Sequence, residues 1–254
     1  MSVSILGKID SVTSEIKKTL GVNVGTLKPA FLERRVFHRM RITKVSNFEE
    51  YFKILSTDLA EVKELYNSFS INVTKFFRDP AVWEKISSDI LPMLDLPIRL
   101  SSINAWSCGC ASGEEPYSIS IMLANFLKNK KYGYNVYATD ISPIALEVAK
   151  NGVYQVENTT NVKPELKLEW LEQTPEGAYH VSSKIKKQVQ FVRSDMLQNS
   201  GKQYDIIFCR NVLIYYDKNA HEQIFNIFHK SLKESGFLII GQDESMIGTE
   251  ARNL

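Results

Sequence analysis

The periodicity of the apolar residues changes near residue 100, and this change constrains the fold more than any other feature. Before it, apolar residues recur at three- and four-residue steps, which is typical of amphipathic helices. After it, short apolar runs alternate with helical patterns, and the runs are INAWS, NVYATD, VQFVR, YDIIFC and FLIIG. Strand and helix alternation with short connections predicts an α/β fold with an open, mostly parallel sheet and helices on both faces.

The same change predicts two domains. Residues 1–78 form a small helical domain with its linker, and residues 79–254 form the α/β domain. Between residues 153 and 188 the periodicity weakens and Pro164 and Pro175 interrupt it, so we expect an insertion with short strands near AYHVS. The last predicted helix is expected to end at Gly236.

The composition is that of an ordinary globular protein. The 254 residues are 44% hydrophobic and 24% charged, which excludes disordered and disulfide-scaffold classes. No apolar stretch approaches about 18 residues, so we expect no transmembrane helix, and we find no signal-peptide pattern. The odd count of 3 cysteines fits a reducing compartment, so we expect a cytoplasmic protein. The scattered histidines and the lack of CxxC spacing predict no metal site.

Positive charge is concentrated in one predicted helix. The first 80 residues hold 13 Lys and Arg against 9 Asp and Glu, whereas the whole chain holds 31 against 29. Apolar residues fall on one arc of this helix, namely Leu32, Val36, Phe37 and Met40. Basic residues fall on the opposite arc, namely Arg34, Arg35, His38, Arg39 and Arg41. This basic face is either a solvated surface or a docking face for an acidic partner. The net charge of +2 supports a nucleic-acid partner only weakly, and we expect none.

The loops that follow the predicted strands are candidates for chemistry, because ligands of doubly wound sheets bind at the carboxyl ends of the strands. The first loop, SCGCASGEEPYS, opens a helix but contains neither GxGxxG nor GK[ST]. Its Glu114 and Glu115 would repel a phosphate and would suit a cationic ligand. Alternatively, Ser112 is the N-cap of a capping box that has Glu115 at its third helical position.

Polar residues follow the other predicted strands as well. Asp140 ends the second strand, where an acidic side chain commonly accepts hydrogen bonds from ribose hydroxyls; otherwise Asp140 or Ser142 caps the next helix. Asp195 and Met196 follow the third strand and offer an edge for an adenine. Further polar residues follow the fourth strand or lie in the linker: Arg210, Asn211, Tyr215, Asn72, Thr74 and Arg78. Alternatively, the segment after the fourth strand is a surface loop with a core tyrosine. The segment with Asn72, Thr74 and Arg78 is alternatively a plain amphipathic linker.

Several segments, taken in order, resemble the chemotaxis-receptor methyltransferases of the CheR type. They are FLERRVFHRM, NVTKFFRDP, ASGEEPYSIS, ATDIS, CRNVLIYYDK and GFLIIG. The resemblance implies a class I, Rossmann-like methyltransferase sheet with a small N-terminal all-helical domain and a small β-subdomain insertion. It also implies methyl transfer from S-adenosylmethionine to receptor glutamates, with S-adenosylhomocysteine as the product. The rival functions are a non-catalytic S-adenosylmethionine-binding signalling module and a methyltransferase with a different acceptor.

The resemblance implies a role for each candidate residue. The cofactor would be contacted by Asn72, Thr74 and Arg78 from the linker, Glu115 at the methionine end, Asp140 at the ribose, Asp195 and Met196 at the adenine, and Arg210 and Asn211 on the pocket floor. Arg78 and Tyr215 would flank the reacting carboxylate as catalytic residues. The basic face would dock to the acidic helical bundle of a methyl-accepting receptor, and we expect a monomer that does not insert into the membrane.

Three features depart from the resemblance. After the last strand the family often has histidine, serine and glutamate, whereas this chain has Gly241-Gln242-Asp243-Glu244-Ser245. The sequence ends soon after Ile240, so we expect no seventh strand. In the insertion, TPEGAYHV is short and has one glycine, so we expect no binding of a receptor's C-terminal pentapeptide by strand addition.

Overall fold

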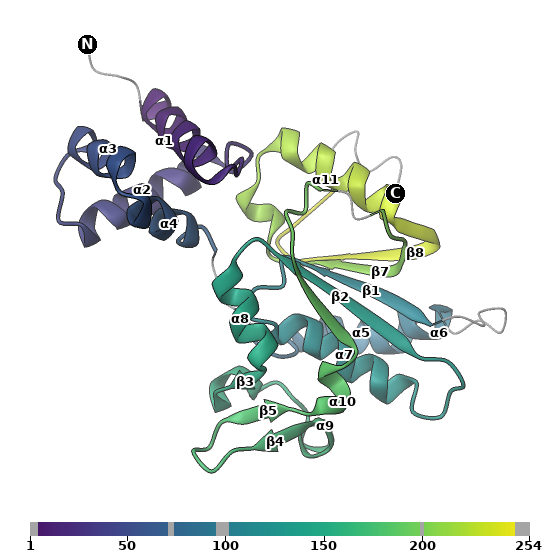
Figure 1. Ribbon diagram of the computed structural model, residues 1–254. Coiled ribbons are helices and arrows are strands. Elements are labelled where there is room, and N and C mark those ends of the chain that lie inside the picture. The colour runs from purple at the N-terminus through teal and green to yellow at the C-terminus, as the bar shows by residue number, and fades with distance from the viewer. Residues whose placement is uncertain (1–4, 71–73, 95–101, 199–200, 247–254) are drawn as a thin grey trace. The chain divides into compact units, whose positions relative to one another are not determined.

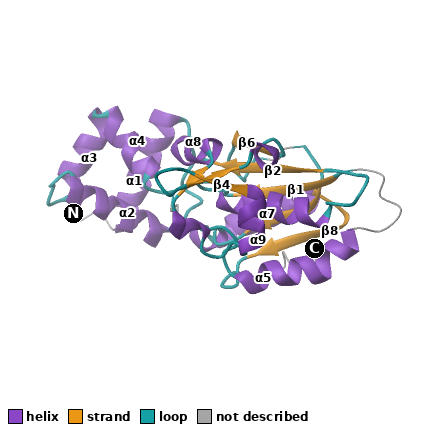
Figure 2. Ribbon diagram, turned by 90° about the horizontal axis from the view of Figure 1, so that it is seen from below, coloured by secondary structure: helices purple, strands orange, loops and turns teal. Residues whose placement is uncertain are grey.

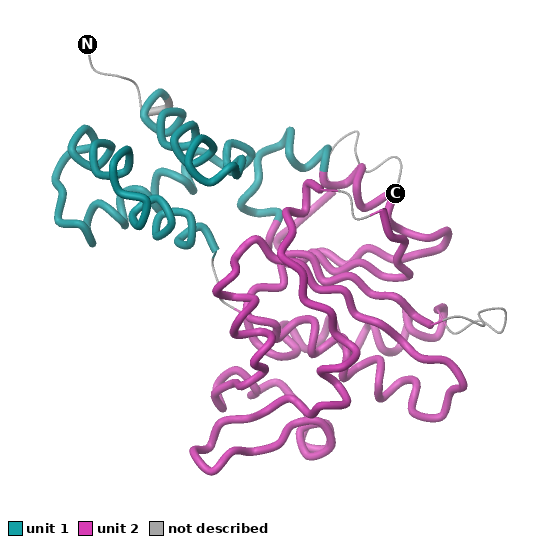
Figure 3. Tube along the Cα trace, in the orientation of Figure 1, with its two compact units in different colours: residues 1–71, 213–223 teal, residues 72–212, 224–254 magenta. Residues whose placement is uncertain are grey.

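The computed structural model describes residues 5–70, 74–94, 102–198 and 201–246 (Figure 1). The chain forms two compact units, one of residues 1–71 with 213–223 and one of residues 72–212 with 224–254 (Figure 3). The predicted boundary after residue 78 differs from this grouping in two places. Residues 72–78 belong to the larger unit, and residues 213–223, which the sequence predicts in the α/β domain, belong to the smaller one.

The described residues before residue 71 of the smaller unit form four helices, as the apolar periodicity predicts (Figure 2). They are α1 (Ile5–Leu20), α2 (Pro29–Ile42), α3 (Phe48–Thr57) and α4 (Leu59–Asn67). Their apolar faces meet in a core in which Ile16, Leu55 and Leu65 are almost fully buried. Side chains cap two of the helices, since Asn47 accepts from the Glu50 N–H and Asp58 from the Ala60 N–H.

The larger unit contains a sheet of five strands that pair in parallel, which confirms the predicted fold class. The strands are β1 (Ile103–Cys108), β2 (Tyr134–Asp140), β6 (Val189–Arg193), β7 (Tyr204–Cys209) and β8 (Leu232–Ile240). Their spatial order is β6-β2-β1-β7-β8. The chain therefore moves outward from β1 in one direction and then restarts at β7 on the other side. This reversal places a switch point between β1 and β7, where such sheets bind their ligands.

Helices cover both faces of this sheet (Figure 1). Trp106 pairs with Ile207 across β1 and β7, so the next residue of β7, Phe208, points to the opposite face. Phe208 stacks on Trp83, with ring centroids 5.7 Å apart, whereas Trp106 meets Phe228 at 5.6 Å. Trp83 belongs to α5 (Pro80–Lys85) and Phe228 to α11 (Lys218–Ser231), so these two helices cover opposite faces of the sheet. The connections β1–β2 and β2–β3 contain α7 (Glu114–Phe126) and α8 (Pro143–Asn151).

The predicted insertion contains its own small sheet. Its strands are β3 (Val153–Tyr154), β4 (Leu171–Gln173) and β5 (Tyr179–Val181), and they are antiparallel in the order β3-β5-β4. Its helices are η2 (Val156–Thr159), α9 (Pro164–Trp170) and α10 (Ser183–Lys186). β5 contains most of the predicted segment AYHVS and is the middle strand.

A π-helical turn η1 (Ile86–Ile90) lies between α5 and α6 (Leu91–Leu94). The prediction that Gly236 ends the last helix is wrong, since α11 ends at Ser231 and Gly236 lies within β8. A Cβ atom at Gly236 would lie 2.9 Å from the Lys233 carbonyl oxygen, so a close backbone approach accounts for this glycine. Among the described helices, none has the length and apolar character to cross a membrane.

Candidate active site

The loop after β1 is tightly packed at the carboxyl edge of the sheet. Gly113 has φ 96°, and a Cβ atom there would lie 2.7 Å from the Cβ of Ala149, so only glycine fits without displacement. Ala111 also has positive φ, at 46°. The backbone of this loop is therefore held in a conformation that ordinary residues adopt rarely.

The capping box predicted for this loop is wrong. The N-cap of α7 is Gly113, and no side chain caps the helix. Ser112 instead donates to the carboxylate of Glu114 at 2.7 Å, and Asn158 Nδ2 donates to the other oxygen at 2.9 Å. Glu114 is only 2% exposed, and this burial raises the pKa of its carboxyl. Glu114 thus ties the loop to the insertion, and Glu115 does not serve the cap.

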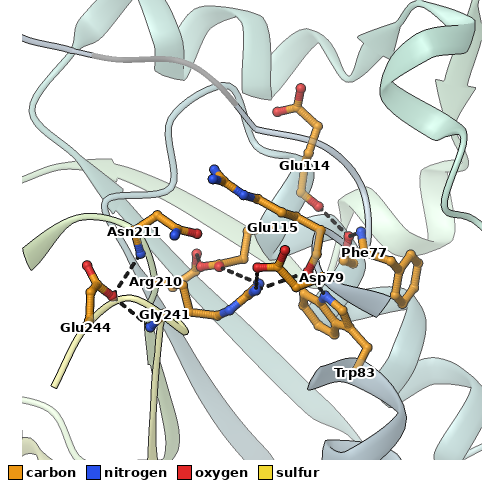
Figure 4. A network of polar contacts seen from close by, with 12 residues as sticks. Phe77, Asp79, Trp83, Glu114, Glu115, Arg210, Asn211, Gly241 and Glu244 are labelled. Carbon is orange, nitrogen blue, oxygen red and sulfur yellow. Dashed lines mark hydrogen bonds and ion pairs between the residues drawn. The ribbon is translucent and has the colours of Figure 1, made fainter. Parts of the chain in front are cut away.

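Glu115 lies next to the strand that precedes it and to Arg210 (Figure 4). Its Oε1 accepts from the Ser107 hydroxyl at 2.8 Å, and its Oε2 lies 3.6 Å from Arg210 Nη1. Burial raises the pKa of Glu115, while the positive charge of Arg210 opposes the shift. The Glu115 side chain is 14% exposed, and a largely buried carboxylate of this kind favours a cationic group that enters beside it.

Arg210 joins the fourth-strand loop to the linker. Its side chain is 2% exposed, and its Nη2 donates to Asp79 Oδ2 at 2.7 Å and to the Arg78 carbonyl at 3.1 Å. Trp83 Nε1 donates to the same carbonyl at 2.8 Å. The Nε of Arg210 is buried and has no hydrogen-bond partner within the described residues. Arg210 therefore fixes the main chain at Arg78 as well as facing Glu115.

The backbone on either side of Arg78 is strained. Phe77 has φ 48° and Asp79 has φ 59°, and such residues cost on the order of 1–3 kcal/mol each. The Phe77 N–H donates to Ser118 Oγ at 2.9 Å, which holds the linker against α7. Strain of this kind persists only where surrounding contacts over-determine it, and it occurs preferentially at functional sites.

Asp140 organises the loops after β1 and β2. Its Oδ2 accepts from the Ala111 N–H and its Oδ1 from the Ser142 N–H, both at 2.8 Å. Ser142 is the N-cap of α8, since its Oγ accepts from the Ala145 N–H at 3.2 Å, so Asp140 is not needed for that cap. Burial raises the pKa of Asp140, and the backbone N–H groups oppose that rise.

The segment after β6 lies beside Asp140. The Ser194 N–H donates to the Asp140 carbonyl at 3.1 Å. Asp195 Oδ1 accepts from the Leu197 N–H at 2.9 Å, which folds the segment into a turn, and Met196 is buried. Their predicted place at the adenine stays a prediction.

Glu244, like Asp79, is a polar residue of this edge that the sequence prediction missed. Its Oε2 accepts from the Asn211 N–H at 2.9 Å and from the Gly241 N–H at 2.7 Å (Figure 4). Asn211 has φ 59°, so the carboxylate holds the exit of β7 in a left-handed conformation next to the exit of β8. The departure noted after the last strand therefore concerns only Gln242 and Asp243, because the glutamate three residues after Gly241 is present and was the available signal.

For three predicted site residues, the described part of the chain gives no contact with the polar groups above. Asn72 lies outside the described residues, and Thr74 is half-buried at the start of the described linker. Tyr215 is half-buried and belongs to the smaller unit, whereas Arg78 belongs to the larger one. The predicted convergence of Arg78 and Tyr215 on one carboxylate therefore stays a prediction.

The basic face of α2 differs from the predicted helix in two places. Arg34, His38 and Arg41 are exposed, but Arg39 is turned inward and its Nη2 lies 2.6 Å from Glu61 Oε2. Phe37, predicted on the apolar arc, is 51% exposed. The Arg39 side chain is 12% exposed because Glu61 is buried beneath it, so this arginine stabilises the helical unit.

A separate cavity of about 550 Å³ lies between α5, η1, α7 and the insertion. Phe77 and Trp83 contribute to its wall, but none of the predicted cofactor residues lines it. It is distinct from the edge of the sheet where the polar contacts gather.

The polar groups at this edge fit an adenosyl cofactor with a positively charged end. Asp140 is buried at the end of β2, the Glu115 side chain is 14% exposed at the start of α7, and the first loop lacks the phosphate-binding pattern. The fold and this site are those of an S-adenosylmethionine-dependent methyltransferase. The family model described as "CheR methyltransferase, SAM binding domain" agrees with this class, since it matches residues 72–253. The model described as "CheR methyltransferase, all-alpha domain" matches residues 8–70. The chain belongs to the CheR methyltransferase family.

Relatives named as chemotaxis protein methyltransferases are similar to nearly the whole chain. A chemotaxis protein methyltransferase of Borreliella burgdorferi is 33% identical over 92% of this chain and 87% of its own. One of Listeria monocytogenes is 32% identical over 92% of this chain and 88% of its own. One of Escherichia coli is 30% identical over 95% of this chain and 85% of its own.

Proposed function

We propose that the protein methylates glutamate side chains of chemotaxis receptors and forms their methyl esters. The names of the relatives support the substrate class, and the contacts of Arg210 support the site. Arg210 carries the proposal, since one buried guanidinium binds the linker at Asp79 and Arg78 and faces Glu115 of the first loop. Segments far apart in the sequence thereby meet at the edge of the sheet where the cofactor would bind.

The chain's own residues supply binding and orientation. When bound, S-adenosylmethionine supplies a methyl group on a sulfonium sulfur. The methyl passes to a carboxylate oxygen, and the sulfur is left as a neutral thioether. Glu115 would hold the positively charged methionine end, and Asp140 would accept from the ribose hydroxyls. Asp195 and Met196 would border the adenine, and Arg210 and Asn211 would form the floor.

The acceptor needs no general base. A glutamate carboxyl has an ordinary pKa of about 4.3 and is ionised at neutral pH. Arg78 would orient this carboxylate and Tyr215 would donate a hydrogen bond to it, so catalysis rests on alignment. Arg78 must not bind the carboxylate too tightly, because methyl transfer removes the charge and ground-state pairing would raise the barrier.

The exposed basic side chains of α2 would meet the acidic part of a receptor helical bundle. Arg34, His38 and Arg41 are exposed and Arg35 is half-buried, and opposite charge on the partner would increase the rate of encounter. Arg39 takes no part in this docking proposal, since it is bound to Glu61. We further propose that the protein acts as a monomer in the cytoplasm. The reducing conditions of that compartment suit its three buried thiols, which form no disulfide.

Labelled methyl transfer tests the function. Protein, methyl-labelled S-adenosylmethionine and membranes that contain the chemotaxis receptors of the same organism should yield labelled receptor. The label should be released by mild base, because a glutamate methyl ester hydrolyses there and an N-methyl group does not. Cofactor binding without transfer would indicate a non-catalytic module, and base-stable label would indicate another acceptor.

A further inference from the structure

The segment that carries Tyr215 is bound to the start of α2. The Lys28 N–H donates to the Tyr215 carbonyl at 2.9 Å, and Lys28 Nζ donates to the Ile214 carbonyl at 2.8 Å. The Asp217 N–H donates to the Thr26 carbonyl at 3.0 Å. Residues 213–223 therefore group with the helical unit, although they follow a strand of the sheet directly in sequence.

The ring of Tyr215 rests on the ring of Phe31. The centroids lie 5.0 Å apart at 43°, a tilted arrangement that aromatic pairs favour. Phe31 is buried and also meets Phe69 at 6.2 Å. The Arg35 guanidinium lies 5.3 Å from the Phe31 ring centroid. Phe31 thus contacts the Tyr215 ring and a basic side chain of α2, and its burial fixes its place.

We propose that Lys28 and Phe31 are positioning residues for Tyr215. Lys28 donates to the carbonyls of the two peptide groups that flank Tyr215, and Phe31 limits the directions that the Tyr215 ring can take. The helix that carries the basic face thereby sets the orientation of the tyrosine hydroxyl. This inference rests on the proposed catalytic role of Tyr215.

Lys28→Met tests the inference, because Lys28 is exposed and the change removes the Nζ donor while keeping a long side chain. Misplacement of a catalytic group lowers turnover steeply, so we expect a loss of about tenfold in kcat. S-adenosylmethionine affinity and the melting temperature should stay unchanged. Lys53→Met is the matched control, an exposed lysine of α3 in the same unit, and should leave kcat unchanged.

A double-mutant cycle with Tyr215→Phe separates positioning from a general effect. If Lys28 acts through the hydroxyl, Lys28→Met should lower kcat by less than about twofold in the Tyr215→Phe background. Phe31→Leu should likewise lower kcat in the wild-type background and have little effect on kcat in the Tyr215→Phe background. If this core variant fails to fold, the Lys28→Met result decides the test by itself.

Two failures are distinguishable. If Tyr215→Phe leaves turnover unchanged, the catalytic role of Tyr215 and this inference fall together. If Tyr215→Phe lowers turnover and Lys28→Met is silent, or equally harmful in both backgrounds, only the positioning role is overturned.

Discussion

The carboxyl edge of the sheet and the outward face of α2 both carry several charged side chains, but in opposite surroundings. At the edge, Arg210, Glu115 and Asp140 are largely buried, and each has hydrogen-bond or ionic partners. On α2, Arg34 and Arg41 are exposed to solvent. Buried charges are fixed and act on atoms they touch, whereas exposed charges act over a distance and are screened by salt. The difference suits chemistry at the edge and docking on the helix.

Arg39 shows that sequence position alone does not assign a residue to one region. It lies on the basic arc of α2, yet its guanidinium binds Glu61, and Tyr51 donates to the same carboxylate at 2.8 Å. Loss of Arg39 should therefore affect the stability of the helical unit, whereas loss of its exposed neighbours should affect encounter with a partner.

The largest effect is expected for Arg78→Ala. The change removes a group that would contact both cofactor and acceptor, so turnover should fall by about 10²–10³ and S-adenosylmethionine affinity should fall as well. Steady-state methylation and calorimetry measure the two effects. Lys75→Ala, an exposed linker neighbour, is the control and should change neither. Unchanged turnover in Arg78→Ala would make Arg78 an ordinary linker residue.

Asp140→Ala should weaken S-adenosylmethionine binding by about 1–3 kcal/mol, because the ribose hydroxyls would lose their acceptor. It should also lower the melting temperature, since the Ala111 and Ser142 N–H groups lose theirs. Calorimetry and thermal unfolding measure the two effects. A loss of stability with unchanged cofactor affinity would reduce Asp140 to a loop-binding residue.

Charge reversal on α2 should separate docking from stability. Arg34→Glu with Arg41→Glu should slow receptor methylation several-fold at low salt and flatten its salt dependence, with cofactor affinity unchanged. Arg39→Gln should instead lower the free energy of unfolding by about 1–3 kcal/mol, because it weakens the bonds to Glu61. If the double reversal methylates at the normal rate in low salt, the face is only a solvated surface.

The smallest effect concerns tethering by the insertion. β5, which follows TPEGA, is paired on both sides by β3 and β4 and offers no open edge to a peptide. We expect no measurable binding of a receptor C-terminal pentapeptide by titration calorimetry. A micromolar dissociation constant would mean that docking does not depend on α2 alone.

The sequence predicted the fold well because periodicity reports burial along each element. The alternation of strands and helices, the helical N-terminal part and the strands near AYHVS are all present in the structure. It predicted the details of the site less well, because these depend on contacts between distant segments. Nothing local in SGEEP tells that Ser112 binds Glu114 and not the helix end, and nothing near Asp79 tells that Arg210 binds it.

Single-turnover kinetics with saturating cofactor and increasing receptor test the division between the two regions most directly. We predict that Tyr215→Phe keeps a reduced rate even at saturating receptor, because the chemical step itself is slowed. The Arg34→Glu, Arg41→Glu variant should recover the wild-type rate at high receptor, because only encounter is impaired. A variant of α2 that stays slow at saturation, together with a Tyr215→Phe variant that reaches the wild-type rate, would contradict the account.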